Sequence, residues 1–320
     1  MPPLPEVLLG EEARQALAGA VFRPRMVAGG IRGGVHLASH LGQSREFSDL
    51  KPYSFGDDLR HLDWKVLART DRAYVRRYLD ETNLSAWLVL DASGSMGEAP
   101  GGVSKYRHGA GLLAALAWVL LQQGDEVAAT VCAEGRLAHL PPRSVPSHWR
   151  DLNSLWVGTR PGGGTDLVPA LREVVVRARR RGIVVIASDL LTAREPVMDS
   201  LRALAARGHA VHLLHVLTPE ERTFPWQGTA VFQSPETRGT ALMDARALRR
   251  SYLQAMQAFL QDWQRACHES RIRYLSVPMT RAAWKEALEV IQSSGTEPGV
   301  GGGPGAPVPG PRASTPRRAL

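Results

Sequence analysis

Cysteine and long apolar runs are both scarce in this sequence. It has two cysteines, Cys132 and Cys267, which excludes a disulfide framework and a four-thiolate metal site, so we expect buried free thiols. The longest nearly continuous apolar run, at 110–121, is shorter than the roughly 20 residues that cross a bilayer. Residues 1–15 have no charged segment followed by an apolar core, so no secretory signal is expected. We therefore expect a cytosolic protein with no part in the membrane.

Lysine is rare, and the common nucleotide-binding motifs are missing. Only four of the 39 cationic residues are lysine, and the formal net charge is +8. The many arginines suit bidentate contacts with carboxylates or phosphates, but this charge does not favour nucleic acid as a partner. The sequence has no Gly-x-x-x-x-Gly-Lys-Ser/Thr loop, no Gly-x-Gly-x-x-Gly after its first predicted main strand and no Gly-x-Ser-x-Gly elbow. Nucleotide binding and serine hydrolase chemistry are therefore disfavoured.

The chain has enough apolar sequence for a folded core. Apolar residues make up 44% of its 320 residues, which excludes a chain that is disordered as a whole. The final residues, 295–320, contain seven Gly and six Pro and are expected to be disordered. We divide the chain into an N-terminal extension (1–82), a main domain (83–292) and a disordered tail (293–320).

From Leu84 onward, short apolar strands alternate with longer helical stretches. This alternation predicts an α/β fold with a doubly wound, mostly parallel sheet. The strand at 182–189 (GIVVIASD) is uniformly apolar, which predicts burial on both faces. Strands are predicted at 85–91, 126–133, 182–189, 209–217 and 271–277, and helices at 105–123, 166–181, 196–207, 244–270 and 281–292.

Two of the predicted strands end in aspartate, Asp91 and Asp189. Ligands of a doubly wound sheet bind beyond the carboxyl ends of its strands, so both carboxylates are expected at one edge. Ser93 and Ser95 follow Asp91 in a turn that contains glycine, and Thr165 follows a run of glycines before a predicted helix. Five side chains with oxygen atoms are therefore expected to converge at this edge.

Such a cluster suits a divalent metal. Hard oxygen ligands favour Mg²⁺ or Mn²⁺, and two carboxylates balance the charge of a dication. Because the remaining ligands are neutral hydroxyls, the metal keeps an open position that an aspartate or glutamate of another protein can fill. The alternative is that Asp91 and Ser93 only cap the following turn. The order of three segments at one sheet edge favours the metal site.

Three histidines, His209, His212 and His215, recur at every third residue. On a strand, His212 points to the face opposite the other two, so the three cannot meet at one zinc ion. A zinc site is therefore not expected there.

The order Asp91-x-Ser93-x-Ser95, Thr165 and Asp189 resembles the metal-ion-dependent adhesion site of von Willebrand factor A domains. The segment at 45–69 (REFSDLKPYSFGDDLRHLDWKVLAR) is similar to the signature of the family called domain of unknown function 58. The stretch at 232–252, in which Pro-Glu-Thr precedes a predicted helix, is also similar to that family. The resemblance covers residues 30–292.

This resemblance implies a bacterial, von Willebrand factor A-like domain with an N-terminal extension. It implies a magnesium or manganese site and a protein partner that supplies a carboxylate to the metal. It also implies an adaptor or assembly factor that works with a MoxR-type AAA+ ATPase. The implied metal residues are Asp91, Ser93, Ser95, Thr165 and Asp189.

The signature segment also has a physical interpretation of its own. Buried ion pairs within it would fix the extension onto the sheet domain. A docking surface for a partner is the alternative. The acidic and basic residues concerned are Asp57, Asp58, Arg60, Asp63, Lys65 and Arg69.

The predicted oxygen cluster also allows a second function, that of a metal-dependent phosphoester hydrolase. Such an enzyme needs a metal-bound hydroxide and usually a second metal or a general base. Glu98, His108 and Asp166 are near in sequence, but none has a spacing that identifies it as the base. We therefore expect a binding protein and not an enzyme.

Overall fold

The computed structural model describes residues 7–22, 45–54, 62–80, 84–97, 102–133, 135–164, 166–233 and 240–293. Several residues named above lie outside this part of the chain, so the predictions made for them are not tested. These are Asp57, Asp58, Arg60, Glu98, Thr165, the Pro-Glu-Thr motif at 235–237 and the tail.

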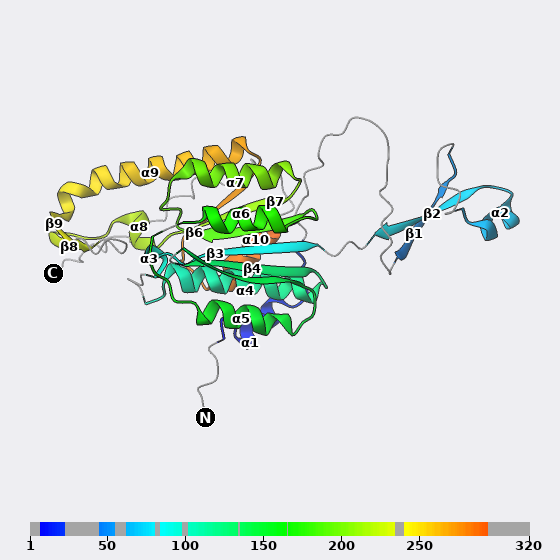
Figure 1. The fold of residues 1–320 in the computed structure, drawn as a ribbon, viewed down its shortest axis with the longest axis horizontal. Helices are drawn as coiled ribbons and strands as arrows, with labels where there is room; N and C mark the ends of the chain where they lie inside the picture. The colour runs from blue at the N-terminus through cyan, green and yellow to red at the C-terminus, as the bar shows by residue number, and fades with distance from the viewer. Residues whose placement is uncertain are drawn as a thin grey trace, which may run out of the picture.

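A six-stranded sheet forms the centre of the main domain (Figure 1). Its strand order is β10-β7-β6-β3-β4-β5. Five strands are parallel, and β5 pairs with β4 in the antiparallel sense at one edge. The fold is therefore the mostly parallel α/β sheet that the sequence predicts. The strands are β3 (Ser85–Asp91), β4 (Glu126–Ala133), β5 (Arg136–Arg143), β6 (Gly182–Ser188), β7 (Ala210–Val216) and β10 (Arg273–Val277).

Helices cover both faces of this sheet, and each face has its own apolar core. The first core contains residues of α1 (Glu11–Leu17), α4 (Lys105–Gln122), α5 (His148–Gly158) and α10 (Ala283–Ser293). The second core contains residues of α6 (Val168–Arg177), α7 (Arg194–Ala206) and α9 (Ala245–Glu269). Because α4 packs between the sheet and other helices, it is apolar around most of its circumference.

Smaller elements complete the described chain. Two short helices lie just after strands of the sheet. The first, α3 (Gly94–Gly97), follows the carboxyl end of β3 after two residues, and the second, α8 (Pro219–Thr223), follows that of β7 after two residues. The antiparallel pair β8 (Thr229–Gln233) and β9 (Thr240–Asp244) precedes α9. In the N-terminal region, α2 (Trp64–Thr70) lies in sequence between the paired strands β1 (Arg45–Pro52) and β2 (Tyr74–Asp80).

The centre of the sheet requires a glycine at the start of β6. A Cβ atom at Gly182 would lie 1.9 Å from the carbonyl oxygen of Ser85 on β3. Only glycine therefore permits this close approach of the two strands. The remainder of β6 is fully buried, as its uniformly apolar sequence predicts.

The N-terminal residues 7–22 are part of the main domain's core. Leu9, Leu17 and Phe22 are buried beside α4 and α10. The backbone N–H of Phe22 donates to Oε1 of Gln123 at 2.8 Å, and the guanidinium of Arg14 lies 5.6 Å from the ring of Trp118. This part of the predicted extension thus packs with the residues that follow 83, although the division of the chain as a whole is still a prediction.

The signature segment contains a helix cap. Oδ1 of Asp63 accepts hydrogen bonds from the backbone N–H groups of Lys65 and Val66, at 3.0 and 3.2 Å, and so caps α2. The cap accounts for one role of Asp63. Fixation of the extension by ion pairs is still a prediction.

The described residues confirm the expected burial of both cysteines, which are free thiols. Among these residues, no helix has both the length and the apolar character needed to cross a membrane.

Candidate metal site at the carboxyl edge of the sheet

Asp91 is the last residue of β3, and two different segments hold its carboxylate. Oδ1 accepts a hydrogen bond from the backbone N–H of Ser93 at 2.9 Å, which closes a local turn. Oδ2 accepts one from the hydroxyl of Ser188, on the neighbouring strand β6, at 2.6 Å. The capping interpretation therefore describes one oxygen of Asp91, while the other is oriented by tertiary structure.

The turn after Asp91 brings two hydroxyl groups together. Oγ of Ser93 and Oγ of Ser95 lie 3.2 Å apart, and both side chains are buried. The glycine run before Thr165 is bonded to this turn, because the N–H of Gly94 donates to the carbonyl of Gly163 at 2.8 Å and a second bond joins Gly162 to Ala92. The structure thus brings the glycine run to the predicted edge, although Thr165 itself lies outside the described residues.

Asp189 follows β6 and is completely buried. Its Oδ2 accepts a hydrogen bond from Nζ of Lys105 at 2.7 Å. The same Nζ lies 2.6 Å from Oε1 of Glu221, which belongs to α8. Lys105 is therefore held between two carboxylates and is only 2% exposed.

Lys105 and Glu221 are residues of this edge that the sequence pattern did not predict. One signal was available for Lys105, which is the first residue of α4. A cation at a helix N-terminus opposes the helix dipole, so a lysine in that position before an apolar helix indicates an acidic partner elsewhere. The identity of that partner was not available from the sequence.

Burial and charge shift the pKa values of these groups. Burial, together with the charge of Asp189, raises the pKa of Asp91 to about 6, although hydrogen bonds from Ser188 and Ser93 act in the opposite direction. Burial alone would lower the pKa of Lys105, but the charges of Asp189 and Glu221 outweigh it and raise that pKa above its usual value. Burial lowers the pKa of His215 to about 4, so this neighbouring imidazole is neutral at pH 7.

The charged groups at this edge do not balance. Asp91, Asp189 and Glu221 are three carboxylates, and Lys105 supplies one ammonium group. With all four ionised, two negative charges are left over. Uncompensated buried charge is unfavourable, and a divalent cation carries the charge that would neutralise it.

The donor set also fits Mg²⁺ or Mn²⁺, with one qualification. Carboxylates and hydroxyls from separate segments meet at the edge, and these are the ligands such ions prefer. Within the described ranges, no group of three or more His, Cys, Asp or Glu side chains forms a metal cluster, so the candidate site depends on the serine hydroxyls. The qualification is Lys105, because its ammonium group occupies Oδ2 of Asp189.

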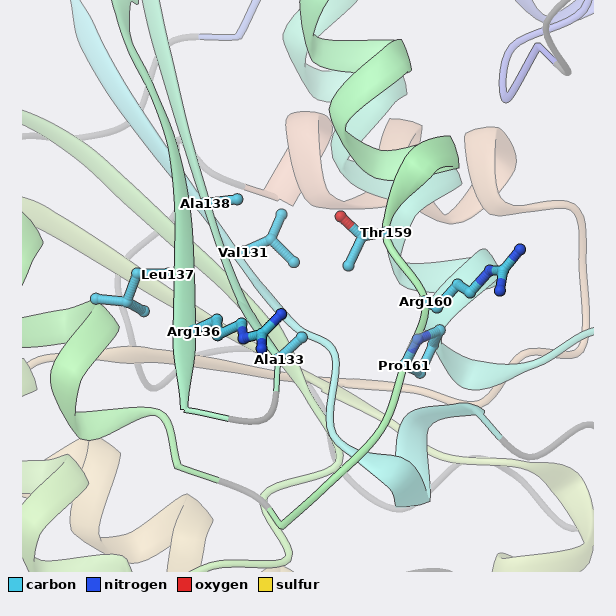
Figure 2. A pocket seen from close by; sticks show the side chains of 8 residues that line it. All are labelled: Val131, Ala133, Arg136, Leu137, Ala138, Thr159, Arg160 and Pro161. Atoms are coloured by element: carbon cyan, nitrogen blue, oxygen red, sulfur yellow. The ribbon is translucent and has the colours of Figure 1, made fainter.

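A cavity of about 550 Å³ adjoins this edge (Figure 2). One lining residue, Pro161, directly precedes the glycine run, and a Cβ atom at Gly97 would lie 3.0 Å from the Cβ of this proline. In Figure 2, Arg136 extends from β5 toward the cavity, with its guanidinium beside Ala133, whereas the guanidinium of Arg160 points away. The cavity lining therefore combines apolar surface with a cationic group. Its other lining residues are Val131, Ala133, Leu137, Ala138 and Thr159.

His212 and His215 lie on opposite faces of β7, as the two-residue period of a strand predicts. His212 packs against Phe22 on one side of the sheet, while His215 packs against Phe259 of α9 on the other. Their side chains therefore lie on opposite faces.

Solved structures show limited similarity to this chain. BatB from Bacteroides thetaiotaomicron is 16% identical with a TM-score of 0.43, and the match covers 66% of this chain and 98% of that one. The VWA domain of SpRpn10 is 7% identical with a TM-score of 0.38, over 65% and 94% of the two chains. These scores are too low to support an argument, so the fold assignment depends on the sheet order described above.

Sequence relatives are closer. This chain is 30% identical over 243 residues to the uncharacterized proteins Mb1516 of Mycobacterium bovis and Rv1480 of Mycobacterium tuberculosis, over 73% of this chain and 75% of theirs. The model of the family described as "Protein of unknown function DUF58" matches residues 49–260, which include Asp91, Ser93, Ser95 and Asp189. The protein therefore belongs to the DUF58 family, as the resemblance of its signature segment predicts.

Proposed function

We propose that this protein is a divalent-metal-dependent protein-binding module. The observation that supports this most directly is that three carboxylates and one ammonium group meet at an edge lined by two buried hydroxyl groups. In this proposal, Ser93 and Ser95 bind Mg²⁺ or Mn²⁺ directly, and Asp91 and Asp189 hold it directly or through coordinated water. Thr165 is the fifth proposed ligand, on the sequence pattern alone.

The chain's own residues prepare this edge for binding. The hydroxyl of Ser188 fixes one oxygen of Asp91, and the glycine run fixes the turn that carries Ser93 and Ser95. Residues that are already oriented lose less conformational entropy when a ligand binds. When bound, the cation would supply a centre that accepts a carboxylate oxygen from another protein.

The proposed partner has an acidic contact surface. A carboxylate from the partner would complete the metal's ligands, and Arg136 in the adjoining cavity provides a nearby cation for a second acidic group. The resemblance stated above makes a MoxR-type AAA+ ATPase the proposed partner, with this protein as its adaptor or assembly factor. Because such a partner consumes ATP, the proposal places both proteins in the cytosol.

A binding role is favoured over phosphoester hydrolysis by the surroundings of two candidate bases. His108 is buried, and its Nε2 lies 2.6 Å from Oε2 of Glu286 on α10, so it is engaged within the core. Oδ1 of Asp166 accepts a hydrogen bond from the backbone N–H of Val168 at 3.3 Å, just before α6. We therefore propose that the protein is not an enzyme. Metal-dependent turnover of a generic phosphoester, lost in Asp189→Ala, would contradict this.

Affinity capture tests the binding proposal. The native protein is used as bait in Mg²⁺ and in chelator, beside Asp91→Ala and the control Asp199→Ala, whose side chain is 74% exposed. Partners should be recovered by the native protein and by the control in Mg²⁺ only, and Asp91→Ala should recover none. Calorimetric titration with Mg²⁺ should show binding to the native protein and the control.

The same experiment gives the outcomes that count against the proposal. If the same proteins are recovered with Asp91→Ala or in chelator, binding does not depend on the metal. An AAA+ ATPase among the metal-dependent partners would support the adaptor role, and its absence from them would leave the binding module with another partner class.

A further inference from the structure

We infer that Lys105 competes with the divalent cation for Asp189, and that Glu221 is the acceptor that allows the lysine to release it. This inference rests on the metal site proposed above. It assigns to both residues the role of setting the affinity of that site.

The geometry places one ammonium group where two partners are available. Nζ of Lys105 lies 2.7 Å from Oδ2 of Asp189 and 2.6 Å from Oε1 of Glu221, and each distance is that of a charge-assisted hydrogen bond. An ammonium group and a metal ion both bind carboxylate oxygens, so they cannot use the same lone pairs of Asp189 at once. The other oxygen, Oδ1, already accepts the backbone N–H of Leu191 at 3.3 Å, so Oδ2 is the oxygen of Asp189 for which Lys105 and the cation compete.

Release of Asp189 would be costly if the lysine had no second partner. Lys105 is 2% exposed, and an isolated buried ammonium group is strongly unfavourable. With Glu221 present, the lysine keeps one carboxylate after it gives up Asp189. Exchange is therefore possible without leaving a buried cation unpaired.

Glu221 is well placed for this role, because it is fixed independently of Lys105. Its Oε2 accepts a hydrogen bond from the backbone N–H of Thr218 at 2.8 Å, and the hydroxyl of Thr218 accepts one from the N–H of Glu221, which together form a capping box. The side chain of Glu221 is 24% exposed, whereas that of Asp189 is 1% exposed. Of the two carboxylates that Lys105 contacts, Glu221 is therefore the more solvent-accessible, and its position is fixed by the capping box.

A double-mutant cycle with Mg²⁺ as the titrant tests this assignment by calorimetry. Lys105→Met removes the competitor and should bind Mg²⁺ about tenfold more tightly or better. Glu221→Gln keeps the capping box but leaves the lysine with Asp189 alone, and should bind Mg²⁺ about tenfold more weakly. If Glu221 acts through the lysine, Glu221→Gln should have little effect in the Lys105→Met background.

Lys285→Met is the matched control, because Lys285 is exposed on α10 with its ammonium group over the ring of Trp284. It should bind Mg²⁺ as the native protein does. Unfolding in urea with chelator is measured for every variant, so that a change in affinity is not confused with a loss of fold. If Lys105→Met does not fold, Glu221→Gln alone still decides, because unchanged Mg²⁺ affinity in that variant overturns the inference.

Two further outcomes would overturn the inference while leaving the proposed metal site intact. The first is Lys105→Met binding Mg²⁺ no more tightly than the native protein. The second is an equal loss of affinity from Glu221→Gln in both backgrounds, which would make Glu221 a direct influence on the metal and independent of Lys105. Absence of Mg²⁺ and Mn²⁺ binding by the native protein and by Lys105→Met would instead overturn the proposed function itself.

Discussion

Replacing Asp91 by asparagine should stabilise the metal-free protein near pH 8. Burial and the charge of Asp189 raise the pKa of Asp91 from 3.8 to about 6. A shift of about two units means that the ionised carboxylate costs the folded state about 3 kcal/mol. Asparagine has no charge, so this cost disappears in Asp91→Asn.

Part of that gain is lost to hydrogen bonding. The carbonyl oxygen of asparagine can still accept the N–H of Ser93, but its amide group must face the hydroxyl of Ser188, which donates to Oδ2 in the native protein. Oγ of Ser188 already accepts a hydrogen bond from the backbone N–H of Leu190 at 2.9 Å. Its second lone pair can accept a hydrogen bond from the amide of the new asparagine. A disturbed hydrogen bond costs about 1 kcal/mol, which leaves a net gain of about 2 kcal/mol at pH 8.

The gain should depend on pH in a defined direction. Because the pKa of Asp91 is higher in the folded state than in the unfolded state, its protonation stabilises the native protein fully below pH 3.8. That stabilisation is lost as the pH rises through 6. From pH 8 to pH 5 this one carboxyl recovers roughly half of its cost of about 3 kcal/mol, so the advantage of Asp91→Asn should fall to under about 1 kcal/mol.

Urea unfolding in chelator at pH 8 and pH 5 measures both effects, with Asp199→Asn as the exposed control. Saturating Mg²⁺ should then stabilise the native protein and have little effect on Asp91→Asn, because ligands that bind only the folded state stabilise it. The reasoning is refuted if Asp91→Asn is less stable than the native protein at pH 8, or if the difference between them is the same at both pH values.

Three further predictions concern the fold. Burial, together with the charge of Arg273, lowers the pKa of His212 to about 3, below its unfolded value, so the stability it contributes is present above pH 6.5 and lost on acidification. This one group should cost about 2 kcal/mol between pH 7 and pH 5, so in urea titrations at the two pH values His212→Leu should lose about 2 kcal/mol less stability than the native protein does. Gly182→Ala should destabilise the protein by about 3 kcal/mol or prevent folding, because its Cβ would lie 1.9 Å from the carbonyl oxygen of Ser85; a near-native midpoint would contradict the close approach of β6 to β3. Asp63→Ala should cost about 1 kcal/mol through loss of the α2 cap, and a much larger loss by the same assay would support the ion-pair fixation of the extension.

The sequence determined the central sheet and the edge at which the candidate site lies. The predicted bounds of β3 and β4 agree with the structure, and β6 differs at one end only. Strands that are buried on both faces are continuous apolar runs, so burial is directly visible in the sequence. The positions of Asp91 and Asp189 follow from the topology of a parallel sheet, and the opposed histidines follow from the two-residue period of a strand.

Elements without a strong periodic signal were missed. The edge strand β5 contains two consecutive prolines, at positions 141 and 142, which normally argue against a strand. It is tolerated because an edge strand leaves one side without a hydrogen-bonded neighbour. The helix α1 is short, and its burial depends on a surface that α4 and α10 create together.

Only the tertiary structure decided how the charges at the site are paired. Lys105 is 84 residues from Asp189 and 116 residues from Glu221, and no spacing in the sequence connects them. A sequence shows which residues can be charged, but the pKa of Asp91 depends on how much water and which neighbouring charges the fold leaves beside it. The apolar strand pattern of the sequence thus located the edge of the sheet that carries the candidate site. Long-range packing decided the charge pairing and the pKa values there, because Coulomb energies depend on distances that exist only after the chain has folded.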